Sequence, residues 1–593
     1  MSIRVADYIV KELQKAGCET VFMITGGMIM HMTDAIFQSK MNYVCFHHEQ
    51  AATMAAEAYG RFTGKLGVAC VTAGPGALNT ITGVVGAYLD SSPCIIVAGQ
   101  SKVSLAKIKG PRQFPLQGFD SLPIFQRITK YAVMLDDISR VRYEVEKCIY
   151  IAKEHRVGPV YLECPIDVQD MHFNPEECEG FIPPAGNRSE EKILDNYAEQ
   201  IKAALLQSNR PCVLAGAGVR LSGAIEQLRE FIEEAQIPII TSRLGMDLID
   251  DNHPLYVGRP GTYGDRAANF TVQNSDLLIV IGCRLAIGLV SYDYKGFAPH
   301  AKKIVIDIDE SELGKPSVIP DIAIKADAYE LFKILNKKMI NIKLDTATWV
   351  KQTQEWKKNY PVDLPEYQKE KGGINSYHFM RVFSEKMQDD TIFVLDTGSC
   401  FHFYAQAFKV KFGQRHIITG GLSTMGYMPA AIGVAAVTRG KEVYCITGDG
   451  SLQMNLQELQ TIAHNKLPVK LMVFNNNGYL LIRHTQKNFC GGRFIGESPR
   501  NGVSFPALKK IAKAYGLNYM KIAKLTDLDA KIEQLKEAKG AIICEIIMPA
   551  EQLLIPRVAS RKLDNGSMVS MPYDDMFPFL PREEYLKNCL YKK

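Results

Sequence analysis

The stretch VYCITGDGS at residues 443–451 decides the fold, because an apolar run typical of a β-strand passes directly into a turn of glycine and aspartate. A second stretch, VKLMVFNNNGY at residues 469–479, repeats the pattern with asparagines after the apolar run. Two parallel strands that end side by side present such turns at the carboxyl edge of one sheet, where open α/β sheets bind ligands. The two stretches therefore predict a parallel α/β sheet with a ligand site at that edge.

The polar residues of these two turns suit a metal bound to a diphosphate. Asp449 and Asn476 offer hard oxygen donors, which Mg²⁺ prefers, and Mg²⁺ keeps its other coordination positions for phosphate oxygens and water. Gly450 and Ser451 are expected to open a helix over residues 452–465, whose free N–H groups favour an anion. Either turn alone is typical of an ordinary loop, but the pair, each after a strand and separated by one helix, favours a metal–diphosphate site.

Length and composition indicate a soluble globular protein of several domains. Its 593 residues exceed what one core can hold, so about three or four domains are expected. Hydrophobic residues make up 47% and charged residues 22%, and the net charge of +5 is small and scattered, so no nucleic-acid partner is expected. The 14 cysteines form no CxxC pair, which indicates reduced thiols. The sequence shows neither a secretory signal nor an apolar span, so we expect a cytoplasmic protein with no membrane partner.

Strand and helix patterns alternate along three segments, as parallel α/β layers require. We expect an N-terminal domain at residues 1–182, a central domain at 190–345, a C-terminal domain at 370–550 and a tail at 551–593. A linker composition over residues 183–189 separates the first two domains. Strands are expected at residues 20–24, 43–46, 68–72, 94–98 and 160–164, at 212–215, 238–241, 277–281 and 303–307, and at 392–395, 443–447, 470–474 and 541–546.

The tail is rich in proline, methionine and aromatic residues, as in MPYDDMFPFLP at residues 571–581. This composition lacks the polarity of a disordered segment, so we expect the tail to pack across a surface of the protein. Two interpretations stay open for it: a cover over the active site, or a structural strap.

A candidate acid lies in the N-terminal segment, in the sequence HHEQAATMAAEAYGR at residues 47–61. These small residues predict a closely packed helix with Glu49 in its first turn, largely withdrawn from water. A buried carboxylate needs a partner or stays protonated. The alternative is a helix-start glutamate favoured by the helix dipole alone. For His47 and His48, a buried and hydrogen-bonded histidine is the preferred interpretation.

Residues 47–100, HHEQAATMAAEAYGRFTGKLGVACVTAGPGALNTITGVVGAYLDSSPCIIVAGQ, closely resemble the pyrimidine-binding domain of acetohydroxyacid (acetolactate) synthase and its relatives. The match extends to Gly26-Gly27 upstream and to LQGFD at residues 116–120 downstream, and the GDG and NN turns match the family's metal-binding motif. The resemblance covers roughly residues 3–550. It implies an α/β enzyme that uses thiamine diphosphate (ThDP), with three doubly wound parallel-sheet domains (pyrimidine-binding, central flavin-type and diphosphate-binding) and a C-terminal tail.

The resemblance also implies roles for individual residues. Glu49 is the acid that activates the cofactor, and Gln117 faces the reacting centre. Pro75 and Asn79 line the pyrimidine pocket. In the C-terminal domain the resemblance implies further cofactor contacts, with the diphosphate gripped by Thr397, Gly398, Ser399 and Cys400, the aminopyrimidine by the carbonyl of Ser423 and the apolar wedge Met425, and Mg²⁺ held by Asp449, Asn476 and the carbonyl of Gly478, beside Gly450, Ser451 and Tyr479. Without the motif, Met425 would be a gap-filling core residue.

The central segment contains a glycine turn, Gly216-Ala217-Gly218, after a strand. A lone GxG is weak evidence, and no third glycine completes a dinucleotide fingerprint. Resemblance to the flavin domain of acetolactate synthase favours FAD, which performs no net redox chemistry in carboligases of this type. The matching positions are Arg156, Gly216, Ala217, Gly218, Thr241, Ser242, Gly258, Gly261, Gly282, Arg284, Asp307, Ile308 and Asp327.

The family resemblance implies an assembly as well. In these enzymes the ThDP site forms between the first domain of one subunit and the third domain of another. A homodimer is then the smallest active unit, and a homotetramer is common.

The sequence departs from acetolactate synthase at two positions that select the acceptor. An arginine four residues beyond the one at Arg284 receives the acceptor carboxylate in that family, and Gly288 stands there in this chain. The family also places a tryptophan after the NN turn, whereas the only tryptophans here are Trp349 and Trp356. Arg483 is a candidate substitute for the missing arginine. The simpler inference is an acceptor other than a free 2-keto acid, because a carboxylate without a partner is costly in a closed site.

These features predict a ThDP-dependent acetolactate synthase-like transferase or lyase. We expect it to decarboxylate a 2-keto acid, pyruvate, and to transfer the acyl-anion equivalent to a carbonyl acceptor, with a keto-sugar preferred. The alternatives are acetolactate synthase proper and a flavin-dependent pyruvate oxidase. The joint presence of Glu49, Asp449 and Asn476 argues against a noncatalytic binding protein.

Overall fold

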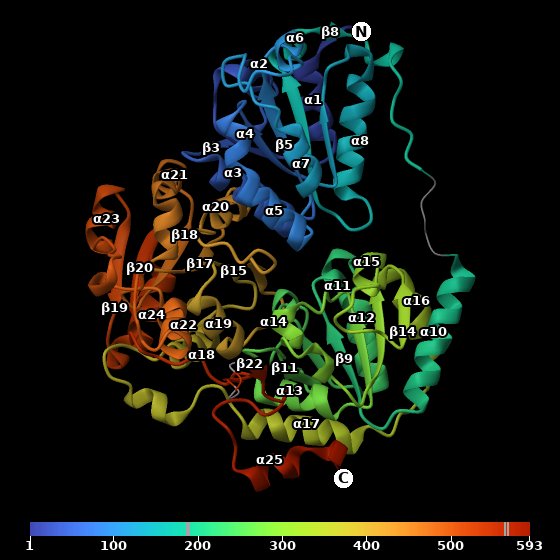
Figure 1. Ribbon diagram of the computed structural model, residues 1–593, viewed down its shortest axis with the longest axis vertical. Helices are drawn as coiled ribbons and strands as arrows, with labels where there is room; N and C mark the ends of the chain where they lie inside the picture. Colours follow the sequence, from blue (N-terminus) through green and yellow to red (C-terminus); the bar gives the residue numbers. More distant parts are fainter. Residues whose placement is uncertain (185–189, 563–564, 566–567, 593) are drawn as a thin grey trace.

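Parallel strand pairing divides the protein into three six-stranded sheets, each in its own domain (Figure 1). The computed structural model describes residues 1–184, 190–562, 565 and 568–592, so most of the expected linker lies outside the described residues. In Figure 1 the N-terminal domain lies at the top, the central domain at the lower right and the C-terminal domain at the lower left. The predicted α/β class with three parallel sheets is confirmed.

The N-terminal and C-terminal domains have the same strand order. In the first, the order is β3-β2-β4-β5-β7-β6, and in the last it is β16-β15-β17-β18-β20-β19. In each, the first strand pairs with the second on one side and the third on the other, which creates a switch point at the carboxyl edge. The strands are β2 (Thr20–Met23), β3 (Asn42–Cys45), β4 (Gly67–Val71), β5 (Cys94–Gln100), β6 (Tyr131–Met134) and β7 (Pro159–Pro165), and β15 (Ile392–Leu395), β16 (Arg415–Ile418), β17 (Val443–Gly448), β18 (Val469–Asn475), β19 (Asn518–Ile522) and β20 (Ile542–Ile547).

The central sheet has a different order, β11-β10-β9-β12-β13-β14. In chain order this is 3-2-1-4-5-6, the arrangement of doubly wound dinucleotide-binding domains, with its crevice between β9 and β12. Its strands are β9 (Pro211–Ala215), β10 (Ile239–Thr241), β11 (Tyr256–Gly258), β12 (Leu277–Ile281), β13 (Lys302–Asp307) and β14 (Ile322–Lys325).

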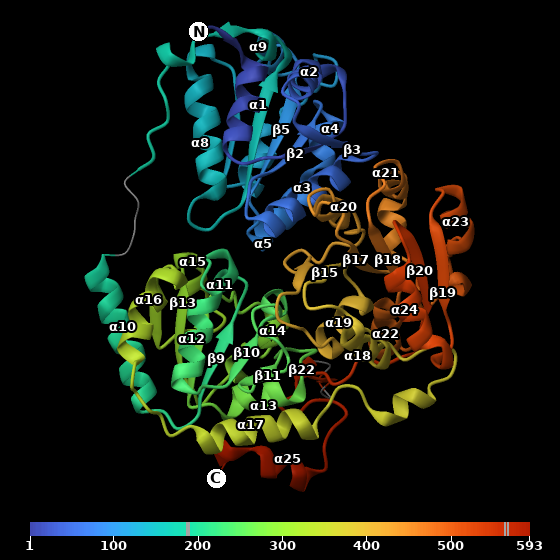
Figure 2. The ribbon, with the colours of Figure 1, turned by 180° about the vertical axis from the view of Figure 1, so that it is seen from behind.

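Helices cover both faces of each sheet (Figures 1 and 2). In the N-terminal domain they are α1 (Val5–Lys15), α2 (Met30–Gln38), α3 (Glu49–Thr63), α4 (Pro75–Asn79), α5 (Ile81–Asp90), α6 (Val103–Ala106), α7 (Leu122–Ile128), α8 (Val141–Lys153) and α9 (Ile166–Asp170). In the central domain they are α10 (Glu191–Leu206), α11 (Gly218–Leu221), α12 (Ile225–Ala235), α13 (Arg266–Asn274), α14 (Ile287–Val290), α15 (Glu310–Leu313), α16 (Ala328–Met339) and α17 (Ala347–Asn359). The remainder are α18 (Ser376–Lys386), α19 (Ser399–Ala407), α20 (Pro429–Ala435), α21 (Leu459–His464), α22 (Leu480–Phe489), α23 (Leu508–Ala514), α24 (Leu528–Glu537) and α25 (Arg582–Asn588). None of the helices within the described ranges combines the length and apolarity that crossing a membrane requires.

The N-terminal and C-terminal domains share one hydrophobic core through α3 and α20, which lie side by side in Figure 2. Small residues allow the two helices to touch. A Cβ atom added at Gly433 of α20 would lie 2.1 Å from the backbone oxygen of Ala55 in α3, so only glycine fits there. This close approach fixes the N-terminal domain on the C-terminal domain of the same chain.

Every strand expected from the sequence is present to within about two residues at each end, which is the usual uncertainty of element boundaries. In the three six-stranded sheets the prediction missed β6, β11, β14, β16 and β19, all of which lie at sheet edges. The expected helix over residues 452–465 is interrupted: a 3₁₀ segment, Ser451–Glu458, with non-helical φ and ψ at Asn455, precedes α21. The cause is tertiary, because the Asn455 side chain donates a hydrogen bond to the carbonyl of Gly426 at 2.7 Å.

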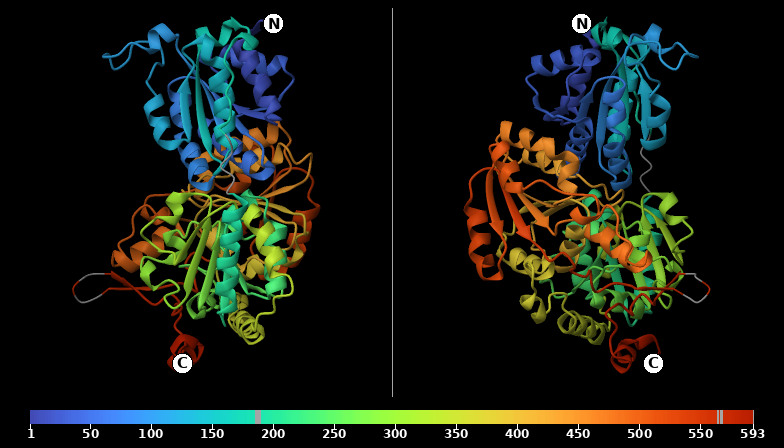
Figure 3. Two further views of the ribbon diagram at one scale, coloured as in Figure 1. Left: turned by 90° about the vertical axis from the view of Figure 1, so that its right-hand side faces the viewer. Right: turned by 60° about the vertical axis from the view of Figure 1, so that its left-hand side comes forward.

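The C-terminal tail crosses the central domain, as the red segment at the bottom of Figure 3 shows. It contains the short hairpin β21 (Ser560–Lys562) and β22 (Met568–Ser570). The side chain of Asn269 in α13 donates a hydrogen bond to the Tyr573 carbonyl at 2.8 Å, and Trp356 of α17 donates one to Asn588 at 2.8 Å. These contacts support the interpretation of the tail as a structural strap.

Candidate active site

Asp449 lies where β17 ends, at the carboxyl edge of the C-terminal sheet. It is 4% exposed. Its Oδ1 accepts a hydrogen bond from the backbone N–H of Gly450 at 2.8 Å, and its Oδ2 accepts one from the backbone N–H of Gly478 at 3.2 Å. Burial raises the pKa of Asp449 to about 7, while these N–H groups favour the charged form. A carboxylate placed in this way is suited to a cation, which compensates for the lost solvation.

Asn476 lies beside Asp449, because β18 pairs directly with β17. It is 6% exposed, and its Oδ1 atom is buried without a hydrogen-bond partner. Leaving a buried acceptor unpaired costs about 1–3 kcal/mol, which coordination of a cation would remove. A carboxylate, an amide oxygen and a backbone carbonyl are the hard donors that Mg²⁺ takes, so the residues fit the predicted ion.

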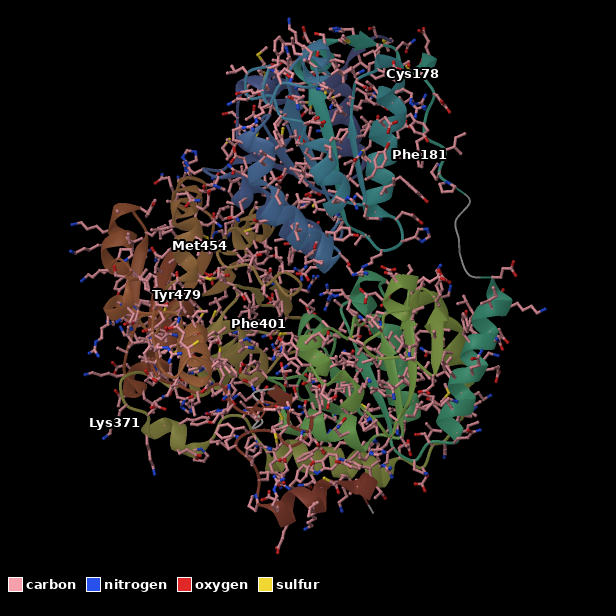
Figure 4. All side chains as sticks on the ribbon, viewed as in Figure 1. Cys178, Phe181, Lys371, Phe401, Met454 and Tyr479 are labelled. Atoms are coloured by element: carbon pink, nitrogen blue, oxygen red, sulfur yellow. The ribbon has the colours of Figure 1, made fainter. Side chains whose placement is uncertain are left out.

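The turn that carries Asn476 requires glycine at its end. Gly478 has φ of +156°, and a Cβ atom there would lie 2.2 Å from the backbone oxygen of Glu497. Tyr479 follows in the same turn and lies within the C-terminal domain in Figure 4. A Cβ atom added at Gly450 would lie 2.2 Å from the Tyr479 ring, so the ring covers the GDG turn. Within the described residues, no group of three or more His, Cys, Asp or Glu side chains could hold a metal ion, so an ion here would depend on neutral oxygens as well.

The predicted diphosphate grip follows β15, at the switch point of the same sheet. Gly398 has φ of +98°, and a Cβ atom there would meet nothing within 4 Å, so the backbone is open to a ligand. The turn is fixed from below by buried Asp396, which accepts hydrogen bonds from the Thr397 N–H at 2.7 Å and from Thr447 Oγ1 at 2.8 Å. Ser399 begins α19, and Cys400 is buried beneath it.

The predicted aminopyrimidine loop is tied to the GDG turn. The backbone N–H of Gly426 donates a hydrogen bond to Ser451 Oγ at 2.8 Å. Ser423 is exposed with φ of +55°, and Met425 is only half-buried. Partial exposure at Met425 differs from what a gap-filling core methionine would show, and the loop leaves both residues accessible to a ligand.

Four predicted residues of the N-terminal domain share one face. The Glu49 carboxylate accepts a hydrogen bond from Asn79 Nδ2 at 2.9 Å, and Pro75 and Asn79 are exposed at the two ends of α4. Gln117, with φ of +55°, lies over the turn before Pro75, because a Cβ atom at Gly74 would lie 2.4 Å from the Gln117 backbone oxygen. This turn brings Gln117 next to the other three.

One expectation for Glu49 is wrong for a single chain: it is half-buried rather than largely withdrawn from water. The described hydrogen bonds of its carboxylate stay within the N-terminal domain. His48 explains the position of the helix start, because its Nδ1 accepts a hydrogen bond from the Gln50 N–H at 3.1 Å and caps α3.

A cavity of about 520 Å³ lies at the crevice of the central sheet and reaches the C-terminal domain. It contains many of the positions predicted for FAD, namely Arg156, Ala217, Gly218, Ser242, Gly282, Arg284, Ile308, Asp307 and Asp327. From the C-terminal side it is lined by Thr397 and Ser423, two of the predicted ThDP contacts. The cavity therefore connects the predicted flavin and ThDP regions.

Four positions predicted for FAD do not line this cavity. Thr241 is fully buried against the Tyr256 hydroxyl, and Gly216 packs against the backbone of Gly282. Gly258 packs on the Asp265 side chain, and Gly261 is fixed by its backbone hydrogen bond to Asn269. These four residues pack within the domain beneath the cavity. The family resemblance did not distinguish such structural positions from residues that line the cavity.

The structure also decides whether Arg483 could substitute for the missing arginine. Arg483 is buried, and its Nε donates a hydrogen bond to Glu497 at 2.6 Å. A second nitrogen donates one to the carbonyl of Ala550. Arg483 is thus occupied as a brace of the Asn477–Gly478 turn, so the suggested substitution is wrong. Gly288 does line the cavity, and a Cβ atom there would meet nothing within 4 Å.

The cavity residues that sequence reasoning missed include Arg243, His402 and Asp90. Arg243 directly follows Ser242 after β10, so its position just past the end of a buried strand could have indicated a cavity residue. His402 lies in α19, whose first two residues, Ser399 and Cys400, were predicted as diphosphate contacts. Asp90 ends α5 and reaches both other domains, which no local pattern indicates.

Comparison with known families accounts for all three domains. Residues 3–123 match the thiamine pyrophosphate enzyme N-terminal TPP binding domain, residues 198–335 match the central domain, and residues 396–546 match the C-terminal TPP binding domain. The matches follow the same order as the three sheets.

Relatives of similar length were also found. The chain is 34% identical to a probable acetolactate synthase large subunit of Methanocaldococcus jannaschii, over 92% of each chain. It is 30% identical to the acetolactate synthase large subunit of Lactococcus lactis over 96% of each chain. It is 32% identical to the acetolactate synthase isozyme 1 large subunit of Escherichia coli, over 93% of this chain and 95% of the relative. The chain therefore belongs to the thiamine pyrophosphate enzymes and is an acetolactate synthase-like member of that family.

Proposed function

We propose that this ThDP-dependent enzyme decarboxylates a 2-keto acid, pyruvate, and transfers the resulting two-carbon unit to a carbonyl acceptor, with Mg²⁺ and FAD as further cofactors. The single observation that carries the proposal is the pairing of the buried Asp449 carboxylate with the unpartnered amide oxygen of Asn476. ThDP, when bound, supplies the carbon nucleophile and the electron sink for decarboxylation. The residues of the chain position and activate it.

The C-terminal domain would hold the charged end of the cofactor. Asp449, Asn476 and the Gly478 carbonyl would bind Mg²⁺, and the open backbone at Gly398 would face the diphosphate. Binding is supported by the preorganised turns, since Asp396 and Ser451 fix them without a ligand. Little rearrangement is then needed on binding.

The N-terminal domain would supply the proton chemistry. Glu49 would hold a proton at its carboxyl group next to the cofactor ring, and Gln117 would face the reacting carbonyl. Because the Glu49 face is open in one chain, a second copy would complete the site and withdraw this carboxyl group from water. Exposed apolar residues on the same loop as Gln117 support a homodimer or homotetramer: Phe114, Leu116 and Phe119 are 60%, 75% and 46% exposed.

The shape of the central cavity supports FAD. It lies at the switch point of a sheet with dinucleotide-binding strand order, and glycines at 218 and 282 let the turns approach each other closely. Asp307 and Asp327 at one end are suited to hydroxyl groups of a nucleotide ribose. The test is simple: acid release of the bound pigment from purified enzyme, identified by mass spectrometry, should yield FAD, and colourless enzyme contradicts this part.

Two acceptors compete for the second step. The keto-sugar expected from the sequence gains no support from the relatives, which are named as acetolactate synthase large subunits. Incubation with labelled pyruvate and a panel of keto acids, aldehydes and keto-sugars, followed by mass spectrometry, separates the two. Acetolactate as the dominant product would select the acetolactate synthase reaction.

A pyruvate oxidase is the remaining alternative. It would reduce its flavin when pyruvate is added without oxygen, whereas the flavin of a carboligase stays oxidised. Anaerobic bleaching of the flavin within the time of one turnover would therefore overturn the carboligase proposal.

A further inference from the structure

Arg243 is a cation in the cavity, and none of the described residues gives it a carboxylate partner. It opens a 3₁₀ turn after β10 and lines the cavity at the border of the central and C-terminal domains. One terminal nitrogen donates a hydrogen bond to the Tyr263 carbonyl at 2.8 Å, and the other lies 3.2 Å from His402 Nδ1. Its guanidinium carbon lies 5.3 Å from the centre of the Phe401 ring. All of these partners are uncharged or aromatic.

The charge balance around Arg243 is incomplete. Among the described residues, no carboxylate oxygen lies within ion-pair distance of its guanidinium, whereas buried Arg259 of the same domain pairs with Asp251 at 3.3 Å. Burial lowers the pKa of Arg243 to about 10, so desolvation outweighs its favourable contacts. Asp265 is the acid that most favours the charged form of Arg243, but its carboxylate accepts a hydrogen bond from the Arg259 backbone N–H at 2.8 Å. A half-buried guanidinium without a carboxylate partner among the described residues favours an anion from outside the chain.

His402 is set up as a neutral neighbour. Since a guanidinium only donates hydrogen bonds, His402 Nδ1 must accept this one. Burial, together with the charge of Arg243, lowers the pKa of His402 well below its usual value, which keeps the ring neutral. The ring also packs on Tyr263, with 4.6 Å between the ring centres. Arg243 is therefore positioned without being neutralised.

Arg243 lies near the place where the sequence lacks an arginine. Gly288 lines the same cavity, and its carbonyl accepts a hydrogen bond from the backbone N–H of Thr262 at 3.0 Å. The next residue, Tyr263, carries the carbonyl that Arg243 binds. Thr397 and Ser423 line the C-terminal side of this cavity. The same cavity is thus lined by Arg243, by Gly288, where the family has an arginine, and by two predicted ThDP contacts.

We propose that Arg243 binds the carboxylate of a 2-keto acid acceptor, and that His402 is the positioning residue that orients its guanidinium. This inference rests on the proposed function. The proposal replaces the inference from sequence that the acceptor has no free carboxylate. Gly288 cannot supply the cation, but Arg243 in the turn after β10 can.

A competition experiment tests the proposal. Enzyme, pyruvate as donor, 2-oxobutanoate as charged acceptor and benzaldehyde as uncharged acceptor are mixed, and the ratio of the two cross-products is measured by mass spectrometry. This ratio does not depend on the rate of the donor step. For Arg243→Met we expect the ratio of keto-acid product to aldehyde product to fall about 10- to 100-fold, the usual effect of losing a charged hydrogen bond. For Arg243→Lys, which keeps the charge but loses the fork geometry of the guanidinium, we expect a smaller fall in this product ratio.

The matched control is Arg229→Met. Arg229 also stacks on an aromatic ring, with its guanidinium carbon 4.4 Å from the centre of Phe412, and its half-buried side chain lies outside the cavity. Its product ratio should equal that of the wild type. Should Arg243→Met fold poorly, Arg243→Lys and His402→Gln provide the same readout at smaller amplitude.

The outcomes separate cleanly. An unchanged ratio in the Arg243 variants, or an equal loss of both products together with loss of FAD, overturns the role of Arg243 while the carboligase proposal stands. If the fall appears only when a nucleotide-linked keto-sugar replaces 2-oxobutanoate, the carboxylate assignment is overturned as well. A wild-type enzyme that consumes no pyruvate contradicts the proposed function and, with it, this inference.

Discussion

Arg284 of the central domain pairs with Asp90 of the N-terminal domain at 3.2 Å. The same carboxylate accepts hydrogen bonds from the backbone N–H groups of Gly420 at 3.0 Å and Gly421 at 2.7 Å in the C-terminal domain. One aspartate side chain, 2% exposed, therefore joins three domains. Gly421 begins the loop that carries Ser423 and Met425, so this contact positions the predicted aminopyrimidine grip.

The first prediction concerns this contact. Asp90→Ala leaves the half-buried Arg284 guanidinium and two N–H groups without their acceptor, which costs up to about 3–5 kcal/mol, the range for breaking a buried pair. We expect a lower Tm by calorimetry and weaker binding of ThDP. The control is Asp136→Ala, because Asp136 forms an exposed pair with Lys107 at 2.8 Å, and such pairs contribute little. Equal Tm values for the two variants would show that the contacts of Asp90 do not stabilise the packing of the three domains.

The second prediction is a pH dependence of metal binding. Because burial raises the pKa of Asp449 to about 7, the carboxyl group is protonated below that pH, and a cation must displace the proton. The affinity of the ThDP-loaded enzyme for Mg²⁺ should fall by up to about tenfold per pH unit below 7 and level off above it. Titration calorimetry in buffers of different ionisation enthalpy measures both affinity and released protons. The same affinity at pH 6 and pH 8 would contradict this prediction.

The third prediction separates two interpretations of Glu49. If it acts as the proton-holding acid, Glu49→Gln should reduce pyruvate decarboxylation by about 10²- to 10⁴-fold and leave ThDP binding intact. If it only favours the start of α3, the variant should lose a few tenths of a kcal/mol of stability and nothing else. Glu226 occupies the first turn of α12, so Glu226→Gln is the matched control for a helix-start glutamate. Full activity in Glu49→Gln would falsify the catalytic role.

The fourth prediction concerns the brace beneath the metal turn. Arg483→Met leaves the buried Glu497 carboxylate, whose side chain is 4% exposed, without its cation. Breaking one partner of such a pair costs about 3–5 kcal/mol, whereas replacing both by apolar residues costs far less. We therefore expect a larger fall in Tm for Arg483→Met than for the double variant Arg483→Met/Glu497→Met. A double variant that is less stable than the single one would refute this account of the brace.

The fifth prediction uses the space at Gly288. A side chain there meets no atom near its Cβ, so Gly288→Arg should fold with nearly unchanged Tm. Its guanidinium would enter the cavity that holds Arg243, and in the Arg243→Met background it should restore part of the preference for the keto acid. The same product ratio in Arg243→Met with and without the second change would show that the two positions do not serve one anion.

The buried strands were predictable from sequence because both of their faces are covered, which gives continuous apolar runs such as those of β17 and β18. The strands that were missed lie at sheet edges, where one side of the strand has no neighbour. β19 has one buried residue out of five, and β14 has two exposed residues out of four. Their sequences resemble loops, and only pairing with an inner strand makes them strands.

The metal turn was predictable for a similar reason, since Asp449 and Asn476 each follow a recognisable strand and adjacent strands end together. Arg243 and Asp90 were not predictable. Their roles depend on which domain lies opposite, and the distance between Asp90 and Arg284 along the chain leaves no local pattern. For Arg483 the local sequence was misleading. Its position after the turn indicated a ligand contact, whereas in the structure its guanidinium forms an ion pair with Glu497.

The absence of room for a methyl group at Gly433 has a mechanical consequence. Since α3 and α20 pack in one shared hydrophobic core, direct helix contact holds the first and last domains together. We therefore expect the motions that admit substrates to occur in loops or in the central domain, rather than at a hinge between the first and last domains.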